Sequence, residues 1–208
     1  TCEAGLPTGV GTSYSWTVPD VASSIPSATS GRFRIRAITY SGSKSVGTKY
    51  VYLTGNVPSS VVPTVGTISV SEATSGLNAQ FGAYIQGKTK LAVRIAASGA
   101  KGSTITAYST TLAGKTYTGS SWTSPVLTNK GSIQLVTKVK DSRGRWSASK
   151  TTTVSLLAYS APQVTKLQAY RVNSAGTADE EGQYLRLDYA YSVTSLNSKN
   201  TASAVVEY

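Results

Sequence analysis

The sequence has no histidine and no methionine, and its single cysteine is Cys2. Without histidine, the chain alone holds neither a Ser-His-Asp triad nor a histidine-ligated metal site. One cysteine forms no disulfide within the chain, so the fold does not rest on a disulfide framework. Because the chain opens with Thr1 and has no methionine, we expect it to be part of a longer polypeptide.

Long apolar runs and charged residues are also scarce. No apolar run approaches the ~20 residues that span a membrane, so we expect no membrane partner. Charged residues make up 14% of the chain, yet Lys and Arg number 20 against 9 Asp and Glu, which gives a formal net charge of +11. This surplus is scattered, with no run of five basic residues, and it indicates solubility as readily as an acidic partner. No nucleic acid is expected, because the sequence lacks zinc-ligand spacing, an aromatic RNA-binding motif and a continuous basic stripe.

The sequence is instead rich in residues that favour strands and turns. Serine and threonine are abundant, and 13 tyrosines stand against only 2 phenylalanines. Tyr, Thr and Val fit pleated, half-buried strands, and Ser and Gly fit turns. In residues 32–36, Arg32, Arg34 and Arg36 alternate with Phe33 and Ile35, which predicts a strand with one wet and one buried face. This composition is typical of an all-β extracellular or virion protein.

The order of features repeats at a spacing of about one hundred residues, the size of an immunoglobulin-type sandwich. Two segments, which begin at Gly31 and Gly131, share the same order of features. Each alternates apolar and polar residues, then reaches a Gly/Ser-rich turn and ends at a proline. We therefore predict tandem immunoglobulin- or fibronectin-III-like β-sandwich domains. Residues 1–61 form the back part of one unit, residues 62–160 a complete unit and residues 161–208 the front part of a third. Proline-containing linkers are expected at residues 57–63 and 159–162.

Within the complete unit, alternation and turn residues predict six strands. Their ranges are residues 65–71, 91–98, 104–110, 115–118, 132–140 and 147–157. Leu77, Phe81 and Ile85 are spaced as on one helix face, but Gly82 and Gly87 argue against a helix there.

The stretch VKDSRGRWS, residues 139–147, is either a basic, aromatic ligand-binding loop or a tight turn between two strands. Asp141 and Gly144 supply turn chemistry, because Asp bonds its own backbone and Gly tolerates positive φ. The turn is the favoured interpretation, with its basic residues at a hairpin tip that meets water. Trp146 either packs on the sheet edge or stands exposed.

Glycan binding is the main alternative to a purely structural role. Sugars bind to aromatic faces with polar neighbours, so the candidates are Tyr117, Trp122 and Trp146 with Arg143 and Arg145. The competing interpretation is that each tryptophan fills one end of the sandwich. A cationic surface would favour anionic wall polymers, through an attraction that salt weakens.

Acidic residues are few and mostly single, so we expect no catalytic site, no enzyme activity and no cofactor. The exception is the cluster Asp179, Glu180 and Glu181 in the loop NSAGTADEEG. It is a weak calcium candidate, since Ca²⁺ takes several oxygen ligands in flexible loops. It lacks the alternating spacing of a calcium loop, and a solvated turn is the alternative.

Several stretches together resemble a known family, namely IPSATSG, TYSGSK, VPSSVVPTVGTISVSEAT, VKDSRGRWSASK, ADEEGQYLRLDYAYSV and NTASAVVEY. They are similar to siphophage minor structural proteins of unknown function, from phages of streptococci and related Gram-positive bacteria. The resemblance implies a virion protein of the tail, in the tail tip or fibre, that supports host attachment. It implies other tail proteins as partners, and host cell-wall polysaccharide if the chain is itself an adhesin. Further residues of the protein or neighbouring subunits are expected to complete the two partial units, the latter as a homo-oligomer.

Overall fold

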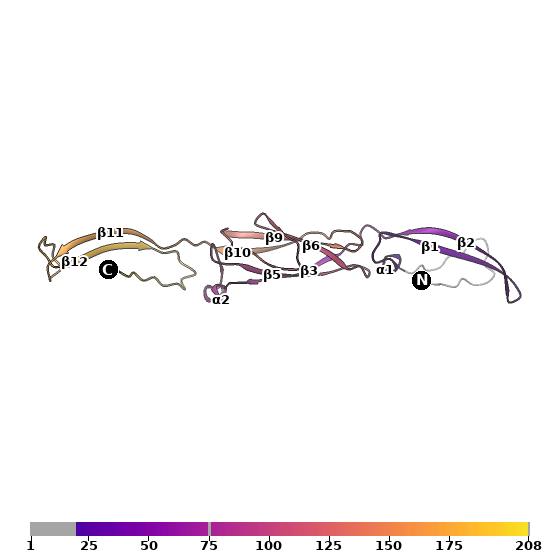
Figure 1. Cartoon of the computed structure of the whole chain (residues 1–208), viewed down its shortest axis with the longest axis horizontal. Helices are drawn as coiled ribbons and strands as arrows, with labels where there is room; N and C mark the ends of the chain where they lie inside the picture. The colour runs from indigo at the N-terminus through magenta and orange to yellow at the C-terminus, as the bar shows by residue number, and fades with distance from the viewer. Residues whose placement is uncertain (1–19, 75, 208) are drawn as a thin grey trace. The chain divides into compact units, whose positions relative to one another are not determined.

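The computed structural model describes residues 20–74 and 76–207 (Figure 1). Strands dominate this part of the chain, and its two helices, α1 (Val21–Ser24) and α2 (Leu77–Phe81), are short. The prediction of an all-β sandwich fold is confirmed. No described helix combines the length and the apolar character needed to cross a membrane.

Backbone contacts group the chain into two units. The first holds the described residues up to Gly66 together with residues 97–108 and 138–148. The second holds residues 67–96, 109–137 and 149 onward. The division passes through the long strands of residues 62–160 and not through a linker, so the domain boundaries proposed from the sequence stay predictions.

A two-stranded hairpin follows α1. Its strands are β1 (Ser30–Ser41) and β2 (Lys44–Asn56), which pair antiparallel around Gly42 at φ 60°. The alternation predicted for residues 32–36 is confirmed, because the three arginines are exposed and Phe33 and Ile35 are half-buried. The Arg32 guanidinium lies 4.4 Å from the centre of the Tyr52 ring, a cation–π contact on the wet face.

Residues 62–160 form two sheets (Figure 1). The three-stranded sheet has the order β3 (Thr64–Glu72), β5 (Leu91–Ser98), β8 (Ser121–Thr123). The five-stranded sheet has the order β4 (Tyr84–Ile85), β10 (Lys150–Leu157), β9 (Gly131–Asp141), β6 (Ile105–Leu112), β7 (Lys115–Tyr117). Within it, β4 pairs parallel with β10 and β9 pairs antiparallel with β10.

Inward-facing residues of both sheets make the core. On β5, Leu91 and Val93 are wholly buried and alternate with more exposed neighbours, as a half-buried strand requires. The five-stranded sheet contributes Leu112, Leu135 and Leu156, each at most 3% exposed. Burying one such side chain stabilises the fold by about 1.5–3 kcal/mol.

The structure corrects the interpretation of residues 77–85. A helix does form over α2, and Gly82, at φ 71°, ends it. Phe81 at the end of that helix then packs with Ile85 and Leu196 in a buried cluster, with Leu77 against it. The apolar spacing therefore predicted the shared packing, whereas the glycine limited the helix to its first turn.

Most strand predictions agree with the structure. β5 matches its predicted range of 91–98, and β3, β6, β7 and β9 differ by two residues or fewer at each end. β10 begins at Lys150, three residues later than predicted, because residues 142–149 belong to the turn and its exit. β4 and β8 were not predicted; both are short, and their strand character depends on pairing with β10 and β5.

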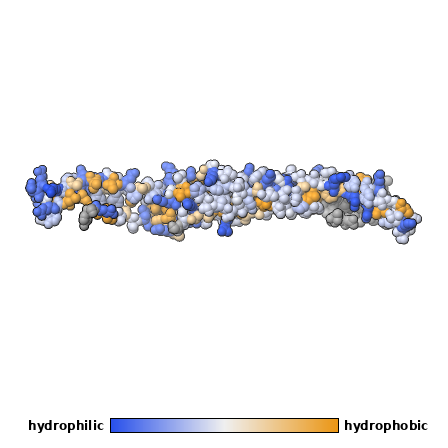
Figure 2. All heavy atoms as spheres, viewed as in Figure 1, coloured by the Kyte–Doolittle hydropathy of each residue, from blue (hydrophilic) through white to orange (hydrophobic). Residues whose placement is uncertain are grey.

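The last strands, β11 (Gln163–Val172) and β12 (Tyr184–Ser192), form a second antiparallel hairpin. Its apolar residues lie largely in the open, with Val164 70% and Leu167 67% exposed. Figure 2 shows apolar residues at the surface where β11 and β12 lie. A hairpin of two strands buries little by itself, so its exposed apolar residues are its most distinctive feature.

Candidate functional site

The turn between β9 and β10 is organised by the buried carboxylate of Asp141, which is 1% exposed. Asp141 Oδ1 accepts hydrogen bonds from the backbone N–H of Arg143 at 3.1 Å and of Arg145 at 2.9 Å. Gly144, at φ 81°, donates its own N–H to the Asp141 carbonyl. This is the Asp-and-Gly turn chemistry that the sequence predicts.

Arg143 turns its guanidinium inward, onto backbone carbonyls. It donates to the carbonyl oxygens of Ala22 at 2.6 Å, Ala100 at 2.8 Å and Lys101 at 2.9 Å, with a longer contact to Ile25 at 3.4 Å. Arg143 Nη1 also lies 3.6 Å from Asp141 Oδ2. A buried charge is tolerated only when its donors are satisfied, and here the planar guanidinium finds several acceptors at once.

Arg145 holds the linker between β2 and β3. Its guanidinium donates to the carbonyl oxygens of Val57 at 2.8 Å, Pro58 at 2.5 Å and Val61 at 2.9 Å. These carbonyls lie in an irregular segment, so they have no strand ladder in which to pair. The arginine therefore fixes the path of the proline-containing linker.

Two further contacts support the same joint. Ser142 Oγ donates to the Pro26 carbonyl at 2.8 Å. Lys101 Nζ lies 2.7 Å from Asp20 Oδ2, and Asp20 in turn caps α1 by accepting from the Ala22 N–H at 3.0 Å. The hydrogen bond from Lys101 is the main cause that lowers the pKa of Asp20 from its ordinary value of 3.8.

We call the set Asp141, Ser142, Arg143 and Arg145 the joint clamp. Asp141 shapes the turn, and the side chains of Ser142 and the two arginines donate to the backbone of residues 22–26 and 57–61, which come before β3. The expectation that the basic residues of this turn meet water is wrong for Arg143, which is 7% exposed. It fails because the turn packs against preceding segments whose carbonyls accept its donors.

Trp146 is placed differently from the two arginines. It is 39% exposed and forms an isolated bridge to Lys140 at the end of β9. The ammonium of Lys138 lies 4.8 Å from the indole centre, and that of Lys140 lies 5.9 Å away. The basic neighbours of Trp146 are thus two lysines, which the sequence analysis did not select.

Tyr117 and Trp122 stack on each other, with ring centres 3.7 Å apart and planes 10° from parallel. Tyr117 is the last residue of β7, and Trp122 lies in the middle of β8, after a short connection. Both rings are half-buried, and burial raises the pKa of the Tyr117 hydroxyl. The Trp122 indole N–H is buried without a hydrogen-bond partner. The five predicted glycan residues therefore fall into two groups, Tyr117 with Trp122 and the turn with Trp146, and sugar binding stays a prediction.

The acidic loop of the last hairpin shows an ordinary turn. Asp179 Oδ1 accepts from the Glu181 N–H at 3.0 Å, and Arg171 donates to the Glu180 carbonyl at 3.1 Å. Within the described ranges, no three acidic or cysteine side chains converge on a point where a metal would sit. The calcium candidate thus gains no geometric support.

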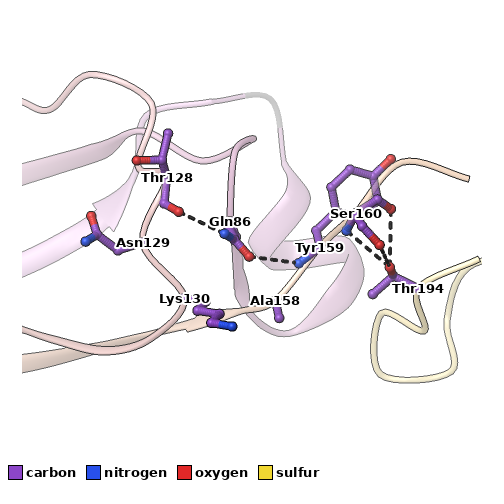
Figure 3. A pocket seen from close by; sticks show the side chains of 8 residues that line it. All are labelled: Gln86, Thr128, Asn129, Lys130, Ala158, Tyr159, Ser160 and Thr194. Carbon is purple, nitrogen blue, oxygen red and sulfur yellow. Dashed lines mark hydrogen bonds between the residues drawn. The ribbon is translucent and has the colours of Figure 1, made fainter.

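An open hollow of about 590 Å³ lies where β10 leads into the last hairpin, and Figure 3 labels its lining residues. Gln86 bridges it, donating to the Thr128 carbonyl at 2.8 Å and accepting from the Tyr159 N–H at 3.3 Å. Thr194 bonds Ser160, 2.7 Å between hydroxyl oxygens. These hydrogen bonds brace the connection between β10 and the last hairpin.

No curated protein matches the chain. Among solved structures, the fibronectin(III)-like modules of Clostridium thermocellum CbhA are similar, at 12% sequence identity and a TM-score of 0.36. That match covers 62% of this chain and 63% of the other, less than two thirds of its length. A family model described as Siphovirus protein of unknown function (DUF859) matches residues 3–178, most of the sequence. The chain therefore belongs to this family of siphovirus proteins.

Proposed function

We propose that the chain is a non-enzymatic structural component of the phage tail, in the tail tip or fibre, where it supports host attachment. Membership of a siphovirus family and a chain made of β modules support this proposal. Membership of the siphovirus family also supports an extracellular location in the virion as part of this proposal. The protein needs no cofactor, no membrane and no nucleic acid.

The observation that carries the proposal is the joint clamp. An extended tail component must transmit force and hold its modules in fixed order, so its linkers need bracing. Arg143 and Arg145 donate to carbonyls that precede β3, at distances from 2.5 to 3.4 Å, and Arg143 also donates to Ala100 and Lys101 within residues 62–160. A turn used for ligand recognition would leave those donors free.

The proposed partners are other tail proteins and further copies of this chain. The hairpins β1–β2 and β11–β12 each expose large apolar residues, among them Tyr50, Val51, Leu167 and Leu185. Two-stranded hairpins are rarely stable alone, so further strands would complete them. Those strands come from additional residues of the protein or from a neighbouring subunit.

Labelling of intact virions tests the proposal directly. Antibodies raised against residues 62–160 are bound to purified phage and located by gold label in the electron microscope. We expect label on the tail, and a pre-immune serum serves as the control. Label absent from virions but present in lysates of infected cells would overturn the structural role.

A second function is favoured by one observation, the exposed indole of Trp146 between two lysines. In this alternative the chain is a carbohydrate-binding adhesin module that itself contacts host cell-wall polysaccharide. Adsorption of the purified chain to host cells tests it, with Trp146→Ala beside the unchanged chain. Equal adsorption of both would remove Trp146 from the site.

A further inference from the structure

The exposed surface around Trp146 is separate in chemistry from the joint clamp beside it. We define the Trp146 patch as Lys138, Lys140 and Trp146. Asp141, Arg143 and Ser147 are buried in the same turn, whereas Trp146 keeps 39% of its surface open to water. A large aromatic ring that the core does not take up is available for contact with another molecule.

The two lysines share the ring. Their ammonium groups lie 4.8 Å and 5.9 Å from its centre. Lys138 and Lys140 are two positions apart on β9, so their side chains leave the same face of the sheet. The patch therefore presents a partly exposed indole ring with two ammonium groups held over it by cation–π contacts.

Residues 62–160 hold few acids that could pair with these lysines. Residues 62–160 hold eleven of the 20 Lys and Arg but only two of the nine acids, Glu72 and Asp141. Asp141 is buried in its turn. Glu72 accepts from the Thr74 hydroxyl and the Asn78 N–H, both at 2.6 Å. An external anion is thus the natural counter-charge for the patch.

We propose that the Trp146 patch binds an anionic saccharide. The apolar face of one sugar ring packs on the open part of the indole, and its acidic group pairs with Lys138 and Lys140. This inference deepens the adhesin function proposed second and rests on it, whereas the structural role does not depend on it. Single-stranded nucleic acid fits less well, because it needs several stacking platforms along a basic groove and the patch has one ring.

The acidic group of such a saccharide is either a phosphate or a carboxylate, and both suit a pair of ammonium groups. Calorimetric titration of the whole chain distinguishes them. The probes are a phosphorylated oligomannose, oligogalacturonate, neutral dextran and a short oligothymidylate, each at low and at physiological salt. Saturable binding of one anionic glycan, without binding of dextran, is the expected result.

Substitutions then locate the site. Lys138→Gln with Lys140→Gln should weaken glycan binding about tenfold or more, since charge-assisted contacts are lost. Trp146→Ala should weaken it by a similar factor. The matched control is Lys44→Gln with Lys49→Gln, which removes the same charge from exposed positions of β2 and should change binding less than about twofold. Amide spectra establish that each variant is folded.

Three results would overturn the proposal. One is no binding of either anionic glycan at low salt, and another is equal loss in both double-lysine variants, which would mean net charge alone. The third is tighter binding of oligothymidylate than of either glycan. None of these results affects the gold labelling of the tail. The structural role and the binding of a saccharide by the Trp146 patch are therefore tested independently.

Discussion

At the scale of single residues, the buried ion pair of the joint clamp holds the turn and the segment around Ala22 in place. Asp141 organises the turn through Oδ1, and its Oδ2 faces Arg143 without a hydrogen bond. Arg143 reaches Ala22, which is 121 positions away in the chain. Desolvating two charges offsets much of their attraction, but removing only one leaves the other buried and unpaired.

Replacement of Arg143 by alanine therefore should be costly. Arg143→Ala leaves the Asp141 carboxylate and several carbonyls without their partner, and we expect a loss of about 3–5 kcal/mol in the free energy of unfolding. Urea denaturation followed by tryptophan fluorescence measures it. The control Arg94→Ala changes an exposed arginine of β5 and should stay within about 0.5 kcal/mol. Equal losses for the two substitutions would show that the buried contacts of Arg143 do not contribute to the free energy of unfolding.

The carboxyl group of Asp20 makes the stability of the folded state depend on pH in the acidic range. Its pKa in the folded chain lies below the ordinary 3.8, chiefly because of the hydrogen bond from Lys101. A lowered carboxyl pKa stabilises the folded state above the unfolded pKa, and this contribution is lost as the pH falls through the folded value. NMR titration of the Asp20 carboxyl carbon should place its midpoint below 3.8, and Lys101→Gln should raise it. A midpoint unchanged by Lys101→Gln would contradict the assignment.

At the scale of elements, polar contacts join strands inside the core. Thr110 on β6 and Thr137 on β9 are wholly buried, and their hydroxyl oxygens lie 3.0 Å apart. The hydrogen bond between them satisfies both hydroxyl groups, which would otherwise be buried without a partner in an apolar environment.

A double-mutant cycle tests that pairing. Thr110→Val and Thr137→Val should each destabilise the folded chain by about 1–3 kcal/mol, because each leaves the other buried hydroxyl without its hydrogen-bond partner. The double variant should cost less than the sum, with a coupling energy of about 0.5 kcal/mol or more, since it removes both polar groups. Chemical denaturation of the four proteins gives the values. Additive costs would mean that the hydroxyl pair is not coupled.

The same scale shows what the sequence could predict. Alternation of Arg32, Phe33 and Arg34 predicted both the strand and its wet face, because period-two patterns are local. β8 was missed because its three residues are a strand only through pairing with β5. The partners of Arg143 and Arg145 were missed for a similar reason. Hydrogen bonds across 42 to 121 positions leave no pattern in neighbouring residues. The lysines beside Trp146 could have been found, since β9 alternation puts them on its outer face.

At the scale of the whole molecule, hydrogen bonds brace two connections between the β elements. Arg145 fixes residues 57–61, and Gln86 and Thr194 brace the connection after β10. Without such contacts a proline-containing linker restricts direction only locally, and neighbouring modules reorient freely.

Proteolysis of the first linker should report its bracing. Arg145→Ala returns the carbonyls of Val57, Pro58 and Val61 to water, so the linker opens more often. Thermolysin, which cuts before valine, should cleave there roughly tenfold faster, as expected when opening becomes about 1.4 kcal/mol easier. Lys49→Ala, a change at an exposed position of β2, is the control. Unchanged cleavage in Arg145→Ala would show that the linker is fixed by something else.

The central claim, that the joint clamp holds the segments flanking the first hairpin against the turn after β9, is tested most directly by a distance measurement. Spin labels are placed at Thr48 and Ala148, both exposed, in a chain in which Cys2 is replaced by serine. Pulsed electron spin resonance should give one narrow distance distribution, which broadens when Arg143→Ala and Arg145→Ala are combined. A distribution that is broad from the start, or narrow in both proteins, would contradict the account.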